Sequence, residues 1–476
     1  MNDNERRRSF PGRRASAPFK QMDYLEFLEK KNYVTENTGF DIDKSELNPK
    51  LYEFQKDIVR WNLAKGRSSD FADCGLGKTA MQLEWGRQVH KHTNGKILVL
   101  APLAVAAQTQ REGIKFGIES KVCESQDDVI DGINITNYEK LDRFIANEFT
   151  GIVLDESSIL KSYTGKVRTD ILDRFRNTPY RLACTATPAP NDYMELGNHS
   201  EFCGVMTRPE MLATFFVHDG GDTSKWRLKG HAESVFWQWL AGWSVFIDNP
   251  SNLGYQIDGY ELPSLSINEI VVDGREPIED SLTLTERRQA RKDSLQQRCQ
   301  YVADLANNSI DQWIIWCDLN DESALLHSLI PDSVEVKGSD KPDHKTNAMI
   351  GFSDGNVRVL VTKPSIAGFG MNWQNCHKMA FTGLSDSYEQ YYQALRRSWR
   401  FGQQNEVDVY IVISSKEGCV KKNIERKQQD FLKMQKAMIE LTKEITKKEI
   451  QQTCRITTPY MPEKKMILPE WKEFSQ

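Results

Sequence analysis

The segment FADCGLGKTA at Phe71–Ala80 constrains the fold most, because it ends in the Gly-Lys-Thr of a phosphate-binding loop. Such a loop wraps phosphate oxygens with backbone N–H groups, and this requires residues without bulky side chains. Gly75 and Gly77 meet that requirement, while Ala72 stands where the full motif has glycine. A chance Gly-Lys-Thr turn before an ordinary helix is the alternative, but the pattern favours a nucleotide site.

Two side chains that end the motif suit a nucleotide with its metal ion. Lys78 can place its ammonium on the β- and γ-phosphates, and Thr79 can place its hydroxyl on Mg²⁺. The helix expected at Ala80–Val89 would direct its N-terminal N–H groups at the same anion. We therefore expect ATP and Mg²⁺ as the bound groups.

A second motif, GIVLDESS at Gly151–Ser158, places two acids after an apolar strand. Open α/β sheets bind their ligands at the carboxyl ends of strands. Asp155 is therefore expected to bind the Mg²⁺ that Thr79 holds, and Glu156 to orient or deprotonate the attacking water. An acidic turn after a buried strand is common by itself, but its pairing with the upstream loop favours the functional interpretation.

Apolar runs of strand length alternate with helical segments in two regions of the chain. This alternation predicts α/β architecture with two tandem doubly wound parallel-sheet lobes. The expected strands lie in Lys96–Ala101, Gly132–Thr136, Gly151–Ser158 and Arg181–Pro188 in the first region, and in Gln312–Cys317, Arg358–Thr362, His377–Thr382 and Val407–Ile413 in the second. The expected helices include Leu51–Arg67, Leu103–Phe116, Leu284–Val302 and Asp321–Leu329.

Composition changes along the chain predict five parts. They are a basic tail with a short helix at 1–45, a first lobe at 46–190, an aromatic-rich insertion at 191–270, a second lobe at 271–418, and a helical tail at 419–476. The aromatic cluster Phe236–Phe246 repeats at helical spacing, so we expect a small core there in preference to a base-stacking platform. The final helix is expected to brace the second lobe.

The segment SYEQYYQALRRSWRFGQ at Ser387–Gln403 is expected to be helical until Gly402. On such a helix Arg397 and Arg400 share a face, because they are three residues apart. Arginines from a second lobe are what a nucleotide site split between two lobes requires, since they stabilise charge on the transferring phosphoryl group. A solvated arginine-rich helix is the ordinary alternative.

The global composition narrows the classes of protein to which the chain can belong. The chain has 476 residues and a net charge of −5, so a nucleic-acid surface would have to be local. No apolar run reaches the roughly 18 residues of a membrane span. The nine cysteines include no C-x-x-C pair, which argues against a zinc site and a disulfide framework and indicates a reducing, cytoplasmic setting.

Taken together, the ordered motifs resemble those of superfamily-two helicases, and within them the Swi/Snf-like double-stranded DNA translocases. The matching segments are YEFQKDIVRW, DCGLGKTA, APLAV, ITNYEKL, DESS, TATPAPNDYMEL, AGFGMN and QALRRSWRFGQ, which cover roughly Leu51–Ser414. The TATP-x-x-N and R-x-x-R-x-G-Q forms favour this branch over the DEAD-box branch. The motif spellings also resemble helicases encoded by bacteriophages, which would place the protein in a host cytoplasm.

The resemblance implies a role for each matching residue. It implies RecA-like lobes with adenine read by Gln55, phosphates held by Gly75, Gly77, Lys78 and Thr79, Mg²⁺ and water handled by Asp155 and Glu156, lobe coupling through Thr185 and Thr187, nucleotide contacts near Gly370 and Gln393, and arginine fingers at Arg397 and Arg400. Two departures are Ser157-Ser158, where many relatives have Ala-His or Ser-His, and Trp399, where histidine is frequent.

The activity implied is ATP hydrolysis coupled to movement along DNA, through largely sequence-independent and salt-sensitive contacts. An RNA helicase of the same superfamily is one alternative, and a non-hydrolysing nucleic-acid-binding scaffold is another. A nuclease is not supported, because the sequence contains no additional carboxylate cluster. The oligomeric state is left open, with a monomer favoured.

Overall fold

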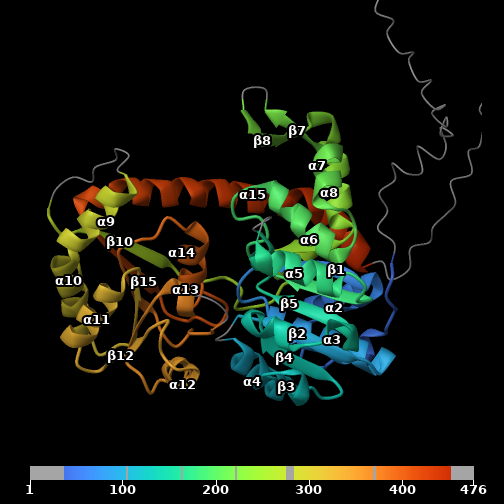
Figure 1. Ribbon diagram of the computed structural model, residues 1–476, viewed down its shortest axis with the longest axis horizontal. Helices are drawn as coiled ribbons and strands as arrows, with labels where there is room; N and C mark the ends of the chain where they lie inside the picture. Colours follow the sequence, from blue (N-terminus) through green and yellow to red (C-terminus); the bar gives the residue numbers. More distant parts are fainter. Residues whose placement is uncertain are drawn as a thin grey trace, which may run out of the picture.

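The computed structural model describes residues 37–102, 105–161, 165–219, 222–274, 283–367 and 371–451. Two parallel sheets, each flanked by helices, form two lobes that lie side by side (Figure 1). This confirms the predicted α/β class with two doubly wound lobes. Residues 1–36 of the expected basic tail, with the short helix expected at Asp23–Glu29, lie outside the described residues.

The first lobe contains a seven-stranded sheet in the order β3-β4-β2-β5-β6-β1-β9. Its strands are β1 (Arg67–Ala72), β2 (Lys96–Ala101), β3 (Ser120–Val122), β4 (Ile133–Asn137), β5 (Phe149–Asp155), β6 (Tyr180–Cys184) and β9 (Ser244–Ile247). The phosphate loop follows β1, and the acidic pair ends β5. Since β5, β6 and β1 are neighbours, the motifs after them meet at one edge of the sheet.

Strand β1 is polar in sequence although it lies inside the sheet. Ser68, Ser69 and Asp70 are all buried in it. The Ser68 hydroxyl donates to Asn62 Oδ1 at 2.7 Å, and Ser69 Oγ lies 3.4 Å from Cys203 Sγ. Burial raises the pKa of Asp70 to about 7. An apolar pattern therefore does not mark the strand that leads into the phosphate loop.

The helices of the first lobe cover both faces of its sheet. They are α2 (Glu53–Lys65), α3 (Lys78–Thr93), α4 (Ala106–Phe116), α5 (Lys166–Phe175), α6 (Leu196–Cys203), α7 (Arg208–Phe215) and α8 (Glu233–Ala241). A short antiparallel hairpin, β7 (Phe216–Asp219) and β8 (Asp222–Leu228), projects beyond α7 and α8 (Figure 1). The hairpin is antiparallel, in contrast to both lobe sheets.

The segment expected to be a separate insertion contributes to both lobes. Strand β9 pairs in parallel with β1 and completes the first sheet, while β10 (Leu265–Val271) pairs in parallel with β15 (Val407–Ile413) of the second. The boundaries at 190/191 and 270/271 therefore differ from the structure. Phe236, Trp239 and Trp243 are buried in the core of the first lobe, in agreement with the core interpretation.

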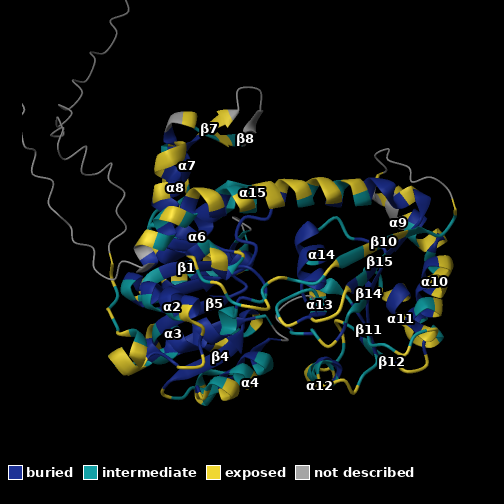
Figure 2. Cartoon of the chain, turned by 180° about the vertical axis from the view of Figure 1, so that it is seen from behind, coloured by how far each residue is buried: buried dark blue, intermediate teal, exposed yellow. Residues whose placement is uncertain are grey.

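The second lobe contains a six-stranded parallel sheet in the order β10-β15-β14-β11-β13-β12. Its other strands are β11 (Trp313–Cys317), β12 (Ser333–Val336), β13 (Val359–Thr362) and β14 (Lys378–Thr382). The helices are α9 (Leu284–Asp293), α10 (Leu295–Asn307), α11 (Asn320–Leu329), α12 (Pro342–Ser353), α13 (Pro364–Ala367) and α14 (Tyr388–Leu395). In both lobes the central strands are buried, whereas the edge strands β3 and β10 are partly exposed and the outer helix faces are exposed (Figure 2).

Two expected helices differ in extent from the prediction. The helix expected at Leu284–Val302 is divided at Ser294 into α9 and α10, because the Ser294 hydroxyl bonds the Ala290 carbonyl and its backbone caps both helices. The helix expected to reach Gly402 ends at Leu395. Arg397 and Arg400 therefore lie in the turns after α14 and not on one helical face.

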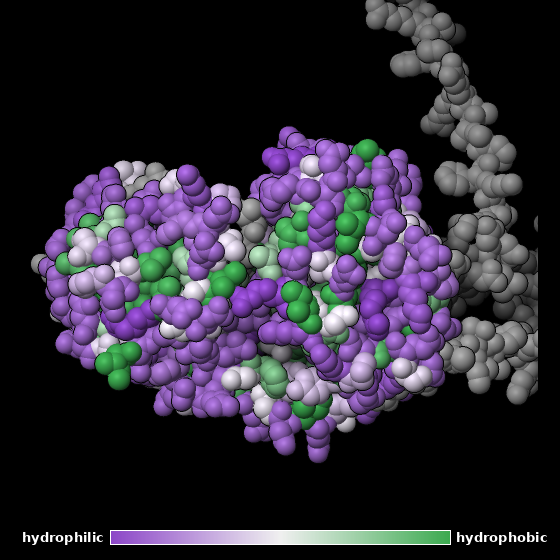
Figure 3. Space-filling view, turned by 90° about the horizontal axis from the view of Figure 1, so that it is seen from below, coloured by the Kyte–Doolittle hydropathy of each residue, from purple (hydrophilic) through white to green (hydrophobic). Residues whose placement is uncertain are grey.

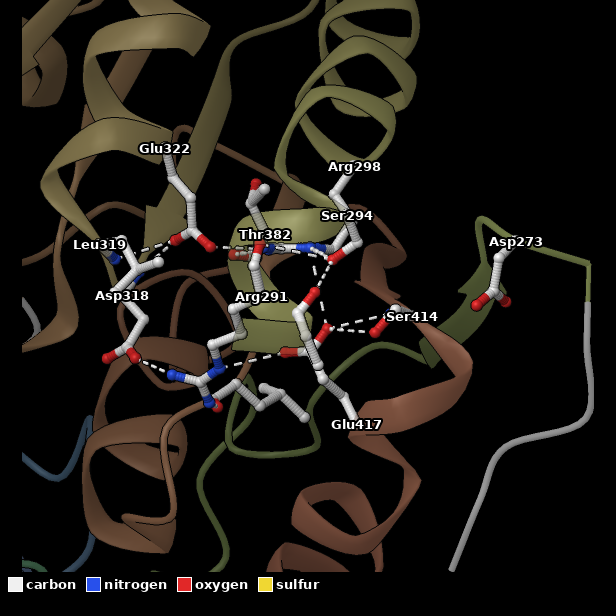
Figure 4. A network of polar contacts seen from close by, with 12 residues as sticks. Asp273, Arg291, Ser294, Arg298, Asp318, Leu319, Glu322, Thr382, Ser414 and Glu417 are labelled. Atoms are coloured by element: carbon white, nitrogen blue, oxygen red, sulfur yellow. Dashed lines mark hydrogen bonds and ion pairs between the residues drawn. The ribbon is translucent and has the colours of Figure 1, made fainter. Parts of the chain in front are cut away.

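A buried ionic network fastens the helices of the second lobe (Figure 4). The Arg298 guanidinium bonds Glu322 Oε1 at 2.7 Å and the Thr382 carbonyl at 2.9 Å, and it lies 3.7 Å from Glu417 Oε2. Arg291 pairs with Glu417 at 3.1 Å and with Asp318. Because Glu417 directly precedes the last helix, the network fixes the base of that helix to the lobe.

Replacing Arg298 by methionine should lower the free energy of unfolding of the second lobe by about 3–5 kcal/mol, because it leaves the Glu322 carboxylate buried without a cation. Both side chains are fully buried. Urea unfolding monitored by tryptophan fluorescence measures the effect. Arg426→Gln removes an exposed pair with Asp430 and is the control, expected to change stability by about 0–1 kcal/mol. Equal losses in the two variants would contradict the prediction.

The last helix, α15 (Gly418–Gln451), extends across both lobes (Figure 1). Near its start, Val420, Ile424 and Phe431 join the core of the second lobe, whereas Met438 and Ile439 join a core of the first. It contacts α8, β9 and α2 in the first lobe. The expectation that the tail braces the second lobe alone is therefore too narrow.

The surface seen from below is mainly hydrophilic, with hydrophobic side chains in small separate groups (Figure 3). Over the ranges that the structure describes, no helix combines the length and the apolar character that a bilayer crossing needs.

Candidate nucleotide site between the lobes

A cavity of about 270 Å³ lies between the lobes at the phosphate loop. The first lobe contributes the sequence-predicted residues Gln55, Gly75, Gly77, Lys78, Thr79, Asp155 and Glu156, and the second contributes Arg397 and Arg400. The structure thus brings nine predicted site residues to one cavity. Gln393 does not line it, and Gly370 lies outside the described residues.

The phosphate loop has the backbone that the glycines were expected to provide. Gly75 and Gly77 have φ of 94° and 81°, in the left-handed region that favours glycine. A Cβ at Gly77 would overlap the Gln55 amide, and one at Gly75 would lie 3.0 Å from the Phe401 backbone nitrogen. Glycine is therefore required at both positions by conformation and by space. Beside them, the Lys78 ammonium donates to the Ala72 carbonyl at 2.8 Å.

The acidic pair is buried beside this loop. Asp155 Oδ1 accepts a bond from the Gln82 amide at 2.8 Å, and burial raises the pKa of the Asp155 carboxyl. Glu156 has φ of 54°, a conformation that costs energy in a non-glycine residue and that occurs preferentially at functional sites. Burial also raises the pKa of Glu156. Such a carboxylate is a better proton acceptor than an exposed one.

The arginines enter the cavity without a carboxylate partner among the described residues. Arg397 donates to the Gln393 side-chain oxygen at 2.8 Å and to the Met371 carbonyl at 3.0 Å. Arg400 reaches the Met371 carbonyl at 3.4 Å, and its Nε has no partner within the described ranges. Burial, with Arg397 close by, lowers the pKa of Arg400 to about 10. A buried Arg397 and a half-buried Arg400, without an acidic partner in the described part of the chain, fit an anionic ligand.

These observations fit a nucleotide triphosphate with Mg²⁺. The glycine backbone leaves space for phosphate oxygens, and Thr79 and Asp155 supply the oxygen ligands that Mg²⁺ prefers. Gln393 acts indirectly: its oxygen orients Arg397, and it lies under the loop against Cys74. The expectation that Gln393 contacts the nucleotide itself differs from its position here.

An aromatic wall closes the end of the cavity near Gln55. Tyr260 and Phe401 stack with ring centroids 4.3 Å apart, and Tyr52 meets both rings edge-on. These residues come from distant parts of the chain, so no local pattern identifies them as a group. A flat, apolar wall beside an amide suits a nucleobase.

The Gln55 amide is held by two hydrogen bonds. Its oxygen accepts from the Tyr52 backbone at 2.9 Å, and its nitrogen donates to the Leu76 carbonyl within the phosphate loop at 2.9 Å. Gln55 therefore joins the base end of the cavity to the phosphate loop, which makes its predicted role in reading adenine physically reasonable.

Replacing Gln55 by alanine should raise KM for ATP by about tenfold and reduce the preference for ATP over GTP, because a buried amide is lost from the base end of the site. Steady-state hydrolysis of both nucleotides measures this. Gln289→Ala removes an exposed amide that pairs with Asp293 and serves as the control. An unchanged ATP:GTP ratio in Gln55→Ala would refute the base-reading role.

The residues expected to couple the lobes form a chain of contacts between them. Thr185 Oγ1 donates to Glu156 Oε2 at 3.4 Å and accepts from the Thr187 backbone at 3.1 Å. Thr187 Oγ1 donates to Glu389 of the second lobe at 3.5 Å, and Lys161 pairs with the same carboxylate. A chain of three contacts thus connects Glu156 with the second lobe.

Both departures from the family pattern have local replacements. Ser157 Oγ lies 3.1 Å from His199 Nε2, so a histidine from α6 lies beside the acidic motif. Burial lowers the pKa of His199 to about 4, so this imidazole is neutral. The Trp399 indole donates to the Pro263 carbonyl at 2.8 Å. Sequence patterns alone do not reveal His199, which is distant from the motif in the chain.

Comparisons with known proteins agree with this arrangement. Residues 295–402 match the family described as the helicase conserved C-terminal domain. No curated protein matches the chain in sequence.

Many solved structures resemble the fold. Dbp5 from S. cerevisiae, bound to RNA and ADP BeF3, matches with a TM-score of 0.54 and 13% identity over 82% of this chain and 93% of that chain. The SWI2/SNF2 ATPase core of Sulfolobus solfataricus, in complex with dsDNA, matches with a TM-score of 0.41 and 16% identity over 86% and 98%. Residues 295–402, in the second lobe, thus match the helicase conserved C-terminal domain, and the fold of two parallel-sheet lobes is similar to that of Dbp5.

Proposed function

We propose that this protein is a nucleic-acid-stimulated ATPase that moves along duplex DNA. The observation that carries the proposal is the cavity at the lobe interface, because it joins a phosphate loop and an acidic pair from one lobe to two arginines from the other. Such a site is complete only when the lobes approach each other. Hydrolysis can then alternate with lobe closure, and alternating grip on a backbone becomes stepping.

The chemical roles follow from position. Lys78, Arg397 and Arg400 neutralise the phosphates, and Glu156 orients or deprotonates the attacking water. Thr79 and Asp155 would hold Mg²⁺, which would help to neutralise the charge of the phosphates. Thr185 and Thr187 transmit the state of Glu156 to Glu389.

A second, larger cavity of about 470 Å³ lies between the same lobes and shares Glu156 with the nucleotide cavity. Lys161 and Lys345 line it together with Glu139 and Glu389, and Lys161 pairs with Glu389, so its lining carries both signs of charge. The nucleic-acid part of the proposal therefore rests on the motif forms and not on this cavity.

The preference for duplex DNA rests on the TATP-x-x-N and R-x-x-R-x-G-Q motif forms. An RNA helicase is the second candidate, favoured by the fold match to a structure bound to RNA. A reducing compartment such as the cytoplasm agrees with the eight described cysteines, all of which are free thiols. An origin in a bacteriophage, indicated by the motif spellings, stays a prediction, as does a monomeric state.

Displacement of a third strand from a DNA triplex tests the proposal, because a protein that steps along duplex DNA removes that strand without separating the duplex. We expect displacement with ATP and none with a non-hydrolysable ATP analogue or with Glu156→Gln. Hydrolysis stimulated by RNA alone, without triplex displacement, would favour the second candidate and refute movement on duplex DNA.

A further inference from the structure

A third arginine, Arg396, contacts the phosphate loop from outside the nucleotide cavity. Its Nη2 donates to Asp73 Oδ2 at 2.9 Å and to the Cys74 carbonyl at 2.9 Å. The Tyr392 hydroxyl donates to the other Asp73 oxygen at 2.7 Å. Neither Arg396 nor Asp73 lines the cavity, whereas Arg397 and Arg400 do. Arg396 therefore has a different task from the other two arginines.

These contacts join the two lobes through buried groups. Asp73 belongs to the first lobe, and Arg396 and Tyr392 to the second, and all three are buried. Arg396 also lies over the Tyr392 and Trp399 rings, at 5.8 and 5.2 Å from their centroids. An ion pair with aromatic cover is shielded from water, so removing one member leaves an uncompensated charge.

The same contacts hold the backbone of the phosphate loop. Asp73 Oδ1 accepts from the Cys74 N–H at 2.7 Å, while Arg396 binds the Cys74 carbonyl. Both polar groups of Cys74 are thus tied to the ion pair one residue before Gly75. Separation of the lobes would remove two donors from Asp73 and one from this carbonyl, so the shape of the loop depends on lobe contact.

We propose that Arg396, Asp73 and Tyr392 form a latch that holds the second lobe against the phosphate loop before nucleotide binds, and that Arg396 is a positioning residue for that loop. The effect on ATP rests on the proposed function, but the effect on lobe contact does not. With the latch closed, the loop is preorganised and ATP binds without a further cost for shaping it. With the latch open, part of the free energy of ATP binding is used to shape the loop, so ATP binds more weakly.

Cys74 provides a native reporter of the latch. Its side chain lies at the lobe interface, with Sγ 3.7 Å from Gln393 Oε1 and 4.0 Å from Arg397 Nη2, and only 7% of the residue is exposed. Separation of the lobes exposes this thiol. Cys299 is fully buried in the second lobe, away from the interface, and is an internal reference in the same sample.

The test measures alkylation of Cys74 by N-ethylmaleimide in the full chain without nucleotide, with each thiol quantified by peptide mass mapping. We expect Arg396→Gln to accelerate alkylation of Cys74 by on the order of tenfold and to leave Cys299 unchanged, because the unpaired Asp73 disfavours the closed lobes. Arg396→Lys keeps a cation at the position where a single nitrogen makes both contacts, and should restore slow alkylation. Arg176→Gln, at an exposed pair with Asp173, is the matched control.

A double variant separates a latch from a simple loss of packing. Asp73→Asn combined with Arg396→Gln removes both charges of the ion pair, so Cys74 should react more slowly than in Arg396→Gln alone. In steady-state hydrolysis, Arg396→Gln should raise KM for ATP by about tenfold and change kcat much less, because Arg397 and Arg400 remain in place. If Arg396 had a merely structural role, the double variant would not slow the alkylation of Cys74. The effect of Arg396→Gln on hydrolysis would then not fall mainly on KM.

The latch is overturned if Cys74 reacts equally in wild type and Arg396→Gln, or if the double variant reacts as fast as the single one. Absence of any ATP hydrolysis in the wild type, together with faster Cys74 alkylation in Arg396→Gln, would refute the proposed function and support the latch. Hydrolysis stimulated by nucleic acid, with unchanged Cys74 reactivity, would have the opposite meaning.

Discussion

Replacing Glu156 by glutamine should reduce kcat for ATP hydrolysis by about 10²–10⁴-fold while ATP binding persists, because the amide cannot accept the proton of the attacking water. Glu156 lines the cavity together with Lys78 and Thr79, and its strained backbone fixes its direction. Glutamine keeps the size of the side chain and its hydrogen bond with Thr185. The phosphate contacts of the loop should therefore survive.

The pH dependence provides an independent check on the same residue. Burial raises the pKa of Glu156, so the protonated, inactive form of the carboxyl persists to higher pH than for an exposed glutamate. The acidic limb of the kcat profile should accordingly lie above the ordinary range for glutamate and disappear in Glu156→Gln. Titration of a fluorescent ATP analogue measures binding, and Glu148→Gln, at an exposed pair with Lys96, is the control. Full hydrolysis by Glu156→Gln would contradict the assigned role.

Replacing Arg400 by alanine should reduce kcat by about 10³–10⁵-fold, the effect expected for an arginine finger. Arg400 is half-buried, and its Nε is buried without a partner among the described residues. Burial and the repulsion from Arg397 beside it lower the pKa of Arg400 to about 10. A bound γ-phosphate relieves that repulsion, and most strongly when charge develops during transfer. The loss should thus appear in kcat more than in KM.

The conservative variant and a matched control sharpen this prediction. Arg400→Lys keeps a charge but not the planar fork, so it should recover only part of the rate. Arg426→Ala removes an exposed arginine of α15 that pairs with Asp430, and should hydrolyse ATP as the wild type does. An Arg400→Ala protein with the wild-type kcat would show that the second lobe supplies no catalytic charge.

The parts of the site that were predictable are those encoded in short stretches. The Gly75–Thr79 loop and the Asp155-Glu156 pair depend on neighbouring residues and on one strand end each. Both lie in the cavity as expected. Strands β2 and β15 coincide with the apolar runs that predicted them. In these cases local pattern and tertiary structure agree.

The sequence correctly predicted that Arg397 and Arg400 lie at the nucleotide cavity, but it wrongly predicted that they lie on a helix. Helix α14 ends at Leu395 because tertiary contacts take over the backbone: the Trp373 N–H bonds the Arg397 carbonyl at 2.9 Å. Gly402 then adopts φ of 89°. Helical spacing does not contain this information, since the competing donor lies in another segment.

Contacts between the lobes were beyond prediction for the same reason. Asp73 and Arg396 are separated by 323 positions, and Thr187 and Glu389 by 202. Nothing in either local sequence indicates the partner. The polar strand β1 shows a related limit, because Ser68 and Ser69 are buried only by virtue of partners on α2 and α6.

The central claim is a nucleic-acid-stimulated ATPase whose site is completed by the second lobe. Steady-state hydrolysis tests it most directly, measured without nucleic acid and with single-stranded DNA, duplex DNA and RNA, for the wild type, Lys78→Ala and Arg400→Ala. We predict strong stimulation by duplex DNA that is lost in both variants. An Arg400→Ala protein as active as the wild type, or no hydrolysis by the wild type under any condition, would contradict the account.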